Sequence, residues 1–168
     1  YVQVVEEEHP AVVVQEIVGA GGRAIAVRAD VTRTVDVEAM VKAVMDRYGR
    51  IDVLVNGVGG WTKLAPVTEI SDDDWDEVLT LNLTSTFRCV RAVAKIMIAQ
   101  KRGRIINMAS VAAQAGSMLA VHYSAAKAGV IGATKSYARL LAKEGITIGC
   151  LRTSWIASPP PPIRCWSA

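Results

Sequence analysis

The sequence predicts an α/β fold built on a parallel sheet with flanking helices. Short apolar runs of strand length alternate along the chain with longer segments that have helical periodicity. Each short run leads directly into glycine or polar residues, as strands that feed a loop at a sheet edge do. A length of 168 residues, with 51% hydrophobic and 21% charged, fits one globular domain. Strands separated by helices predict βαβ units with right-handed crossovers.

The first part of the chain predicts a helix, a strand and a second helix. Residues 10–17 are largely apolar and lead to a cluster of glycines at 19–22, which is typical of a helix with a glycine stop. Residues 24–29 alternate and include β-branched side chains, which predicts a strand. Asp30 and Thr32 then supply turn and N-cap chemistry. Apolar residues at helical spacing follow at Val37, Met40, Val41 and Val44.

The βα pattern then repeats. Residues 51–55 are apolar except for Asp52 and have the length of a buried strand. They lead into the glycine-rich loop 56–60, where a ligand can approach the backbone closely. Ser71, with Asp74 three residues later, begins a helix as a capping box. The helix continues to about residue 99, and its buried face is formed by Leu79, Leu83, Phe87, Val90 and Ala94.

The last elements complete the predicted sheet. Gly103 ends the preceding helix, residues 104–108 form a buried strand, and a loop at 109–118 leads to a helix at 121–142. A final strand is expected at 146–151. From residue 158 the chain contains four consecutive prolines, which neither a helix nor an inner strand accepts. We therefore expect one α/β domain at 1–157 and an irregular proline-rich tail at 158–168.

Composition and charge argue against several classes of function. The net charge is only +3, and the basic residues between Arg88 and Arg104 alternate with apolar ones, so no nucleic-acid partner is expected. No apolar run reaches the roughly 18 residues that a membrane span needs. Three consecutive glutamates at 6–8 argue against a signal peptide, so we expect a cytoplasmic protein without a membrane partner.

Cysteine and histidine show no pattern of a disulfide framework or a metal site. The residues concerned are Cys89, Cys150, Cys165, His9 and His122. Cys89 fits a small core side chain. We therefore predict no metal.

Polar and glycine residues follow the predicted strands, where ligands bind in open α/β sheets. They are Asp30, the loop 56–60, Ser110, and Thr153 with Ser154. Taken singly, Asp30 fits an N-cap and Ser110 a turn or cap residue, so position alone leaves structural roles open.

Tyr123 and Lys127 are the sharpest local signal. Residues four apart lie on one face of a helix, so both side chains can address one ligand. A free phenol has a pKa of about 10, and a nearby ammonium stabilises the phenolate and lowers that pKa. Tyr123 is therefore a candidate proton donor to a developing alkoxide. The alternative is a pair of ordinary amphipathic surface residues.

The context of this pair resembles the short-chain dehydrogenase/reductase family from about Val12 to Ile156. Ser110 lies thirteen residues before Tyr123, and Asn82 interrupts an otherwise apolar helical face, where by itself it would be a packing hydrogen bond. The matching stretches are Asp30-Val31, Asn56-Gly57-Val58-Gly59, Asn82-Leu83, Gly103-Arg104-Ile105-Ile106-Asn107, Ser110, and Tyr123 to Lys127 followed by Ala128-Gly129. Residues 59–61 and 103–110 look like the 3-oxoacyl carrier-protein reductase branch.

The resemblance implies a catalytic role for several residues. Tyr123 would be the acid/base, and Ser110 would orient and polarise the substrate oxygen. Lys127 would hold the nicotinamide ribose and lower the pKa of the tyrosine. Asn82 would hold a water that connects the lysine to solvent. Two further expectations concern the substrate cleft, with Trp61 as a wall and His122 as a substrate contact.

The resemblance also implies that residues 1–157 form a partial dinucleotide-binding and catalytic domain with a Rossmann-like fold and an NAD or NADP cofactor. Asp30 and Val31 would contact the adenine, Asn56 and Gly57 would line the cofactor trough, and Lys127 and Ile156 would complete the cofactor contacts. The positions that choose between NAD and NADP are missing or doubtful, so both cofactors remain open.

The activity implied is reversible reduction of a small-molecule ketone, with a 3-oxoacyl thioester as one candidate, to a secondary alcohol. A homodimer or homotetramer is expected. The alternative is a noncatalytic truncated member whose two long helices serve only for dimerisation or another interaction.

The chain departs from the family pattern at both ends. It lacks the T-G-x-x-x-G-I-G loop whose backbone holds a pyrophosphate. The first strand and last strand are expected to be missing, and residues 1–5 to be the trailing edge of the second strand. A gap would then lie at the centre of the family's sheet, which predicts a rearranged or dimer-assisted sheet. Thr153 and Ser154 replace a Pro-Gly pair, and the family's substrate-binding helices do not follow.

Overall fold

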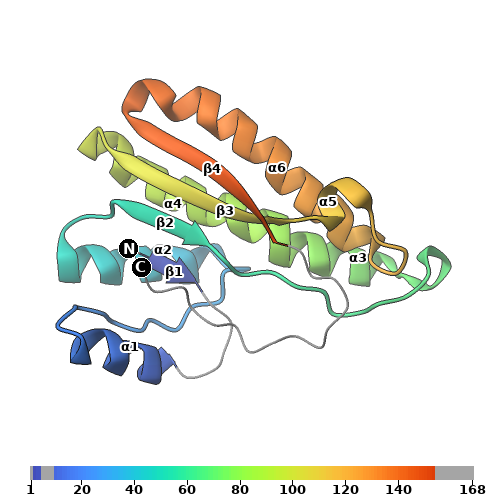
Figure 1. Ribbon diagram of the computed structural model, residues 1–168, viewed down its shortest axis with the longest axis horizontal. Coiled ribbons are helices and arrows are strands. Elements are labelled where there is room, and N and C mark those ends of the chain that lie inside the picture. Colours follow the sequence, from blue (N-terminus) through green and yellow to red (C-terminus); the bar gives the residue numbers. More distant parts are fainter. Residues whose placement is uncertain (1, 5–9, 154–168) are drawn as a thin grey trace.

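The computed structural model describes residues 2–4 and 10–153 of the chain. Within them lies a four-stranded parallel sheet in the order β1-β2-β3-β4 (Figure 1). The elements follow the order β1 (Val2–Val4), α1 (Pro10–Gly19), α2 (Thr34–Tyr48), β2 (Val53–Asn56), α3 (Asp72–Leu79), α4 (Ser85–Gln100), β3 (Gly103–Ser110), α5 (Ala112–Ala115), α6 (Val121–Leu141) and β4 (Ile146–Thr153).

The helices α2, α4 and α6 lie side by side against the sheet (Figure 1). The spatial order of the strands equals their sequence order, so successive right-handed crossovers place their helices on the same face. Alternate side chains therefore point toward these helices. Ile105 and Asn107 are fully buried on that face, whereas Ile106 and Met108 on the other face remain partly exposed.

The predicted gap in the sheet is wrong for the described residues. β1 pairs in parallel directly with β2, with Val2 opposite Leu54 and Val4 opposite Asn56. The first segment of the chain therefore takes the place beside β2 and satisfies the backbone groups that a gap would have left unpaired. Of the two expected solutions, the sheet adopts the rearranged one within this single chain.

The strand expected at residues 24–29 does not form. These residues have no regular secondary structure, and Ile25 and Val27 are exposed. A strand requires a neighbour that pairs with its N–H and C=O groups. In the described sheet β1 is an edge strand, and residues 24–29 do not pair with it. The strand prediction is therefore wrong here, because an alternating local sequence does not supply a partner strand.

One core lies between the sheet and α2 and α4. Its fully buried members come from all of these elements, and they are Val37, Ile51, Leu54, Val93, Met97 and Ile105. Most fall at the helical and strand spacings that the sequence predicts. The core fixes β2 and β3 against α4 and thereby places the ends of both strands.

The long helix expected at about 73–99 forms, but it is interrupted. α3 begins with the predicted capping box: Ser71 Oγ accepts a hydrogen bond from the Asp74 N–H at 3.1 Å, and the Asp74 carboxylate accepts from the Ser71 N–H at 3.0 Å. A π-helical turn at Thr80–Thr84 then joins α3 to α4. A π turn adds a residue to the helix and frequently marks a functional site.

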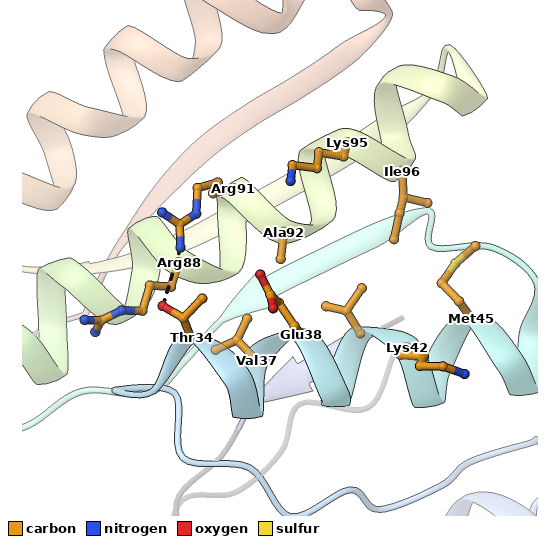
Figure 2. Close-up of a pocket in the computed structure, with 11 residues that line it drawn as sticks. Thr34, Val37, Glu38, Lys42, Met45, Arg88, Arg91, Ala92, Lys95 and Ile96 are labelled. Carbon is orange, nitrogen blue, oxygen red and sulfur yellow. Dashed lines mark hydrogen bonds between the residues drawn. The ribbon is translucent and has the colours of Figure 1, made fainter.

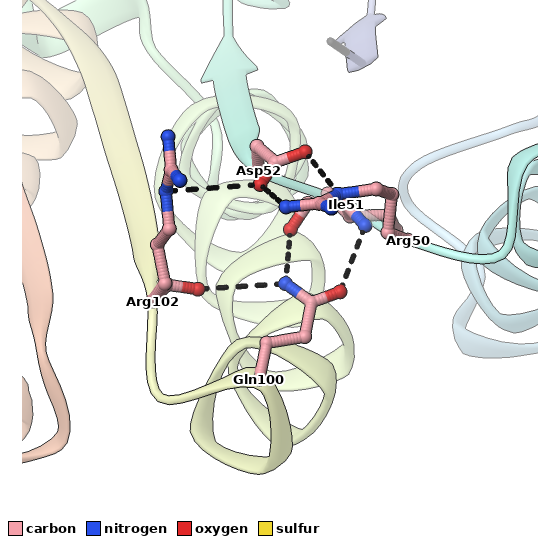
Figure 3. Close-up of polar contacts among 5 residues, drawn as sticks. All are labelled: Arg50, Ile51, Asp52, Gln100 and Arg102. Atoms are coloured by element: carbon pink, nitrogen blue, oxygen red, sulfur yellow. Dashed lines mark hydrogen bonds and ion pairs between the residues drawn. The ribbon is translucent and has the colours of Figure 1, made fainter.

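Polar contacts surround the segment that leads into β2, at the end of α4 (Figure 3). The Gln100 side chain, at the end of α4, accepts from the Ile51 N–H at 3.1 Å and donates to the Ile51 carbonyl at 2.8 Å. Arg50 donates to both carboxylate oxygens of Asp52, at 2.7 and 2.6 Å. The two Gln100 hydrogen bonds fix the segment before β2 to the end of α4 and thereby help to position the strand.

The remaining boundaries agree closely with expectation. β3 and β4 each extend two residues beyond the predicted strands at their carboxyl ends, and β2 begins two residues later than predicted. The expected loop at 109–118 contains the short helix α5, which the pattern missed because it is only four residues long. A 3-10 turn at Ala142–Glu144 ends α6. Ser154, Ile156 and the tail at 158–168 lie outside the described residues.

Candidate active site

Three strands end at one edge of the sheet, and each ends on a polar residue. β2 ends at Asn56, β3 at Ser110 and β4 at Thr153. Ser110 and Thr153 are register partners on neighbouring strands. The Thr153 hydroxyl donates to the Ala109 carbonyl at 3.2 Å, and the Val111 N–H donates to the Thr153 carbonyl at 3.0 Å. This edge therefore carries the polar groups that the sequence places after each strand.

Tyr123 faces Ser110 from the first turn of α6. The Ser110 hydroxyl lies near enough to the phenol to affect its pKa, and Tyr123 is 6% exposed. The Ser110 oxygen also accepts from the Ala112 N–H at 3.2 Å, which holds the serine at the start of α5. The predicted pair of tyrosine and serine is therefore brought together by β3, α5 and α6.

Trp61 packs against the same tyrosine. Its ring meets that of Tyr123 edge to face, with centroids 5.1 Å apart and planes at 75°. The indole is 38% exposed, so part of it faces solvent beside the phenol. The tryptophan comes from the loop after β2, and its expected role as a wall of the substrate cleft stays a prediction.

Lys127 lies one helical turn beyond Tyr123 and is 4% exposed. Its Nζ donates to the Met108 carbonyl of β3 at 3.1 Å and sits 5.6 Å from the centre of the Tyr123 ring. Burial lowers the pKa of Lys127 to about 8, an effect that the nearby Cys150 side chain opposes. An ammonium with one protein partner retains hydrogens with which it can hold a ligand.

The pKa of Tyr123 shifts upward, opposite to the expected direction. Burial raises this pKa, and the hydrogen bond with Ser110 opposes the increase only in part. The Lys127 ammonium is 5.6 Å from the centre of the Tyr123 ring, and it is not among the causes of this shift. In this arrangement the phenol is kept protonated, which suits a proton donor.

Asn82 sits fully buried in the π turn between α3 and α4. Its side chain binds the backbone of Gly60 twice: the Oδ1 atom accepts from the N–H at 3.1 Å, and the Nδ2 atom donates to the carbonyl at 2.7 Å. Nδ2 also donates to the Val78 carbonyl at 2.9 Å. Asn82 thereby fastens the glycine-rich loop to the long helix.

Gly59 lies where this loop approaches Asn82 and Lys127 most closely. A Cβ atom on Gly59 would lie 2.5 Å from Asn82 Oδ1 and 2.6 Å from Lys127 Nζ, closer than side-chain contacts allow. The absence of a side chain is therefore what lets the loop, the asparagine and the lysine meet. The sequence indicates a close approach in this loop but does not indicate what Gly59 contacts.

The residues expected to bind the cofactor do not all line one cavity. Val31 and Asn56 line one small cavity together with Val58, Ser85, Thr86 and Cys89. The Asp30 carboxylate is occupied by Thr32, whose N–H and hydroxyl donate to it at 2.8 and 2.6 Å, and these bonds lower the pKa of Asp30. Gly57 is exposed beyond the end of β2. Ile156 lies outside the described residues.

A series of buried hydrogen bonds connects the strands and the helix that carry the site residues. Asn56 Nδ2 donates to Asn107 Oδ1 at 2.8 Å, and Asn107 Nδ2 donates to the Thr134 hydroxyl of α6 at 2.9 Å. The Thr134 hydroxyl in turn donates to the Val130 carbonyl at 2.7 Å. This chain links β2, β3 and α6 and was not predicted, because the pairing of Asn56 with Asn107 depends on strand register.

The structure contradicts the role expected for His122 and agrees with the role expected for Cys89. His122 is fully buried, so its side chain is not presented to a substrate. Cys89 is buried in the core as expected, and burial raises its pKa to about 11. Among the described residues no cluster of three or more histidine, cysteine or acidic side chains could hold a metal ion.

A larger groove of about 360 Å³ lies between α2 and α4 (Figure 2). Arg88, Arg91 and Lys95 form one wall and Thr34, Glu38 and Lys42 the other, with Arg91 donating to the Thr34 hydroxyl at 3.5 Å. None of the predicted site residues lines it. The groove is therefore separate from the cluster around Tyr123.

The described residues fit one part of a dinucleotide. Near Tyr123, the buried Lys127 ammonium keeps donor capacity beyond its bond to Met108, which suits ribose hydroxyls. Val31 and Asn56, in contrast, line a cavity of only about 10 Å³, which is the size of one water molecule and too small for an adenine ring. The given sequence contains no glycine-rich helix start for the phosphates. The residues present thus fit the ribose next to the nicotinamide better than the adenine or the pyrophosphate.

Comparison with known proteins identifies the family that the sequence resembles. A family model described as short chain dehydrogenase matches residues 2–160. A 3-oxoacyl-[acyl-carrier-protein] reductase of Synechocystis sp. is 46% identical over 146 residues, which are 87% of this chain and 59% of the relative.

Solved structures agree with the family model. A metagenomic short-chain oxidoreductase in complex with NADP superposes with a TM-score of 0.80 at 32% identity, covering 84% of this chain and 64% of that one. An NAD+-bound xylitol dehydrogenase gives a TM-score of 0.80 at 33% identity, covering 84% and 54%.

The chain belongs to the short-chain dehydrogenase family. It is similar to 3-oxoacyl-[acyl-carrier-protein] reductases. It spans about three fifths of their length. No helix among the residues that the structure describes is both long enough and apolar enough to cross a membrane.

Proposed function

We propose that this chain forms the catalytic part of an NAD(P)-dependent oxidoreductase that interconverts a ketone and a secondary alcohol. The observation that carries the proposal is the position of the Ser110 hydroxyl, which lies near enough to the Tyr123 phenol to lower its pKa, with the Lys127 ammonium 5.6 Å from the centre of the Tyr123 ring. The relatives' names support a 3-oxoacyl thioester as the ketone. The neighbours solved with NADP and with NAD+ support either dinucleotide as the cofactor.

In the proposed mechanism, Tyr123 moves the proton. Ser110 and Tyr123 together donate hydrogen bonds to the substrate oxygen, which polarises the carbonyl. As negative charge develops on that oxygen, the phenol transfers its proton to form the alcohol. The raised pKa of Tyr123 keeps the proton available at neutral pH. In the reverse direction the same phenolate accepts the proton.

Lys127 and Asn82 organise the surroundings of the phenol. Lys127 would hold the nicotinamide ribose, and its positive charge would stabilise the phenolate after proton transfer. Asn82 fixes the loop at Gly60 and so keeps Gly59 against the lysine; the water that it is expected to hold is part of this proposal. The nicotinamide supplies the hydride. Asp30, Val31, Asn56, Gly57 and Ile156 would contact the rest of the cofactor.

Self-association and a cytoplasmic location go with this proposal. Phe87 was predicted in the buried face of its helix, but it is 42% exposed on α4, because α4 turns Cys89, Val90, Val93 and Met97 toward the core instead. Leu140 on α6 is 65% exposed. Burial of such side chains against a second copy would stabilise a homodimer or homotetramer. Sedimentation of the chain with Phe87→Ser, compared with the unchanged chain, tests this part separately.

Titration with NADH and with NADPH, followed by tryptophan fluorescence, tests the proposal. Trp61 packs on Tyr123, so a nucleotide bound beside Tyr123 should change its emission. The proposal predicts saturable binding, which Lys127→Met weakens; Trp61→Phe should reduce the change in emission without weakening the binding. Failure of both nucleotides to bind would contradict it and favour the noncatalytic alternative.

A further inference from the structure

His122 directly precedes Tyr123 in the first turn of α6, and its side chain is fully buried. Its Nδ1 atom accepts a hydrogen bond from the backbone N–H of Tyr123 at 2.9 Å. The contact joins the side chain of one residue to the backbone of the next. It therefore acts on the position from which the phenol projects.

The N–H of Tyr123 needs this acceptor because the start of α6 offers no other. The N-cap residue Ala120 has no side chain that accepts a hydrogen bond. The Leu119 carbonyl, four residues before Tyr123, accepts instead from the Ala65 N–H at 2.9 Å. The helical ladder begins only with the Ser124 N–H, which donates to the Ala120 carbonyl at 3.0 Å.

We infer that His122 is a positioning residue for Tyr123. An Nδ1 atom that accepts a hydrogen bond carries no proton, so the neutral imidazole has its proton on Nε2. Among the described residues Nε2 has no hydrogen-bond partner, so the bond to Tyr123 alone sets the polar orientation of the ring. The expected effect on turnover rests on the proposed function of Tyr123, but the contact itself does not.

Three variants separate this role from simple packing. His122→Asn keeps an acceptor close to Nδ1 and lacks Nε2, which has no bond to lose. His122→Phe keeps the bulk of the ring and removes the acceptor. Val130→Ala opens the packing of the same helix two turns away without touching the Tyr123 N–H.

Turnover gives the first readout. His122→Phe should lower kcat by about 10- to 100-fold, because small displacements of a reacting group cost that much, and KM for the dinucleotide should not change. His122→Asn should retain most of the kcat. Val130→Ala should lower the melting temperature and leave kcat alone. Equal losses in the Asn and Phe variants, or none in Phe, would overturn the inference.

Nitrogen-15 NMR of the unchanged chain gives a readout that needs no activity. We expect the proton on Nε2 of His122 and slow exchange of the Tyr123 amide, which becomes faster by about tenfold or more in His122→Phe but not in His122→Asn. A proton on Nδ1 would overturn the inference even if His122→Phe fails to fold. If the unchanged chain shows no turnover, the proposed function fails while this measurement still decides the role of His122.

Discussion

Gly59 and the Lys127 ammonium lie so close that a single methyl group between them would reach within 2.6 Å of Nζ. Lys127 is held on its other side by the Met108 carbonyl at 3.1 Å, so it cannot retreat without losing that bond. The loop after β2 and the helix α6 therefore determine the position of the lysine jointly. This relationship makes the glycine a sensitive point at which to test the site.

Gly59→Ala should displace Lys127 and Asn82 and lower turnover by about 10- to 100-fold. The neighbouring Gly60→Ala is the matched control, because a Cβ atom there would meet no other atom within 4 Å. Steady-state kinetics of both variants provide the test. Equal activity in the two variants would contradict the proposed contact of the loop with the lysine.

Tyr123→Phe should lower turnover by about 100-fold or more while leaving dinucleotide binding intact, because it removes the transferable proton and little else. Tyr137, which lies on the same helix and is half-buried, provides a control for loss of a phenol hydroxyl. Tyr137→Phe should keep nearly full activity. A Tyr123→Phe variant with ordinary kcat would show that the proton comes from elsewhere.

Lys127 should reduce stability below pH 8. Its pKa is about 8 in the folded chain against 10.5 for an ordinary lysine, so between these values the unfolded chain binds more protons. The free energy of unfolding should therefore rise with pH from about 8 to 10.5. The shift corresponds to about 3 kcal/mol at most.

Lys127→Met removes this buried charge and tests that pH dependence. The variant should unfold in urea at neutral pH no more easily than the unchanged chain, and its stability should lack the rise above pH 8. Turnover should nevertheless be lost. A variant that is destabilised by several kcal/mol would indicate that the bond to Met108 outweighs the cost of burial.

Asn107→Leu should cost about 2 kcal/mol of unfolding free energy, because it leaves the Asn56 side-chain donor buried without its partner. The double variant Asn56→Leu with Asn107→Leu should be less destabilised than the sum of the two single changes. Urea unfolding of the four proteins measures the coupling. Additive losses would show that the two amides do not act as a pair.

Periodicity predicted the elements that bury one face and failed where structure depends on a distant partner. The helices α2, α4 and α6 follow from apolar spacing, and the capping box at Ser71 follows from local chemistry. Residues 24–29 have a strand pattern but find no strand to pair with. The pairing of β1 with β2 joins segments about fifty residues apart, which no local pattern specifies.

The candidate site shows the same division. Spacing on a helix placed Tyr123 and Lys127 together, and the resemblance added Ser110, which the structure brings to the phenol. The Met108 carbonyl and the pairing of Asn107 with Asn56 were not foreseen, since a backbone acceptor has no sequence signature and register is a tertiary property. The predicted direction of the Tyr123 pKa shift was wrong because the main cause is burial, which spacing does not reveal.

Transfer of deuterium from dinucleotide labelled at the reactive ring carbon to a 3-oxoacyl thioester tests the central claim most directly. The account predicts that the chain delivers the label to the carbonyl carbon, and that Tyr123→Phe binds the same nucleotide but delivers almost none. If nucleotide and thioester both bind and no label moves, or if Tyr123→Phe transfers it as fast as the unchanged chain, the assignment of Tyr123 as the proton donor is contradicted.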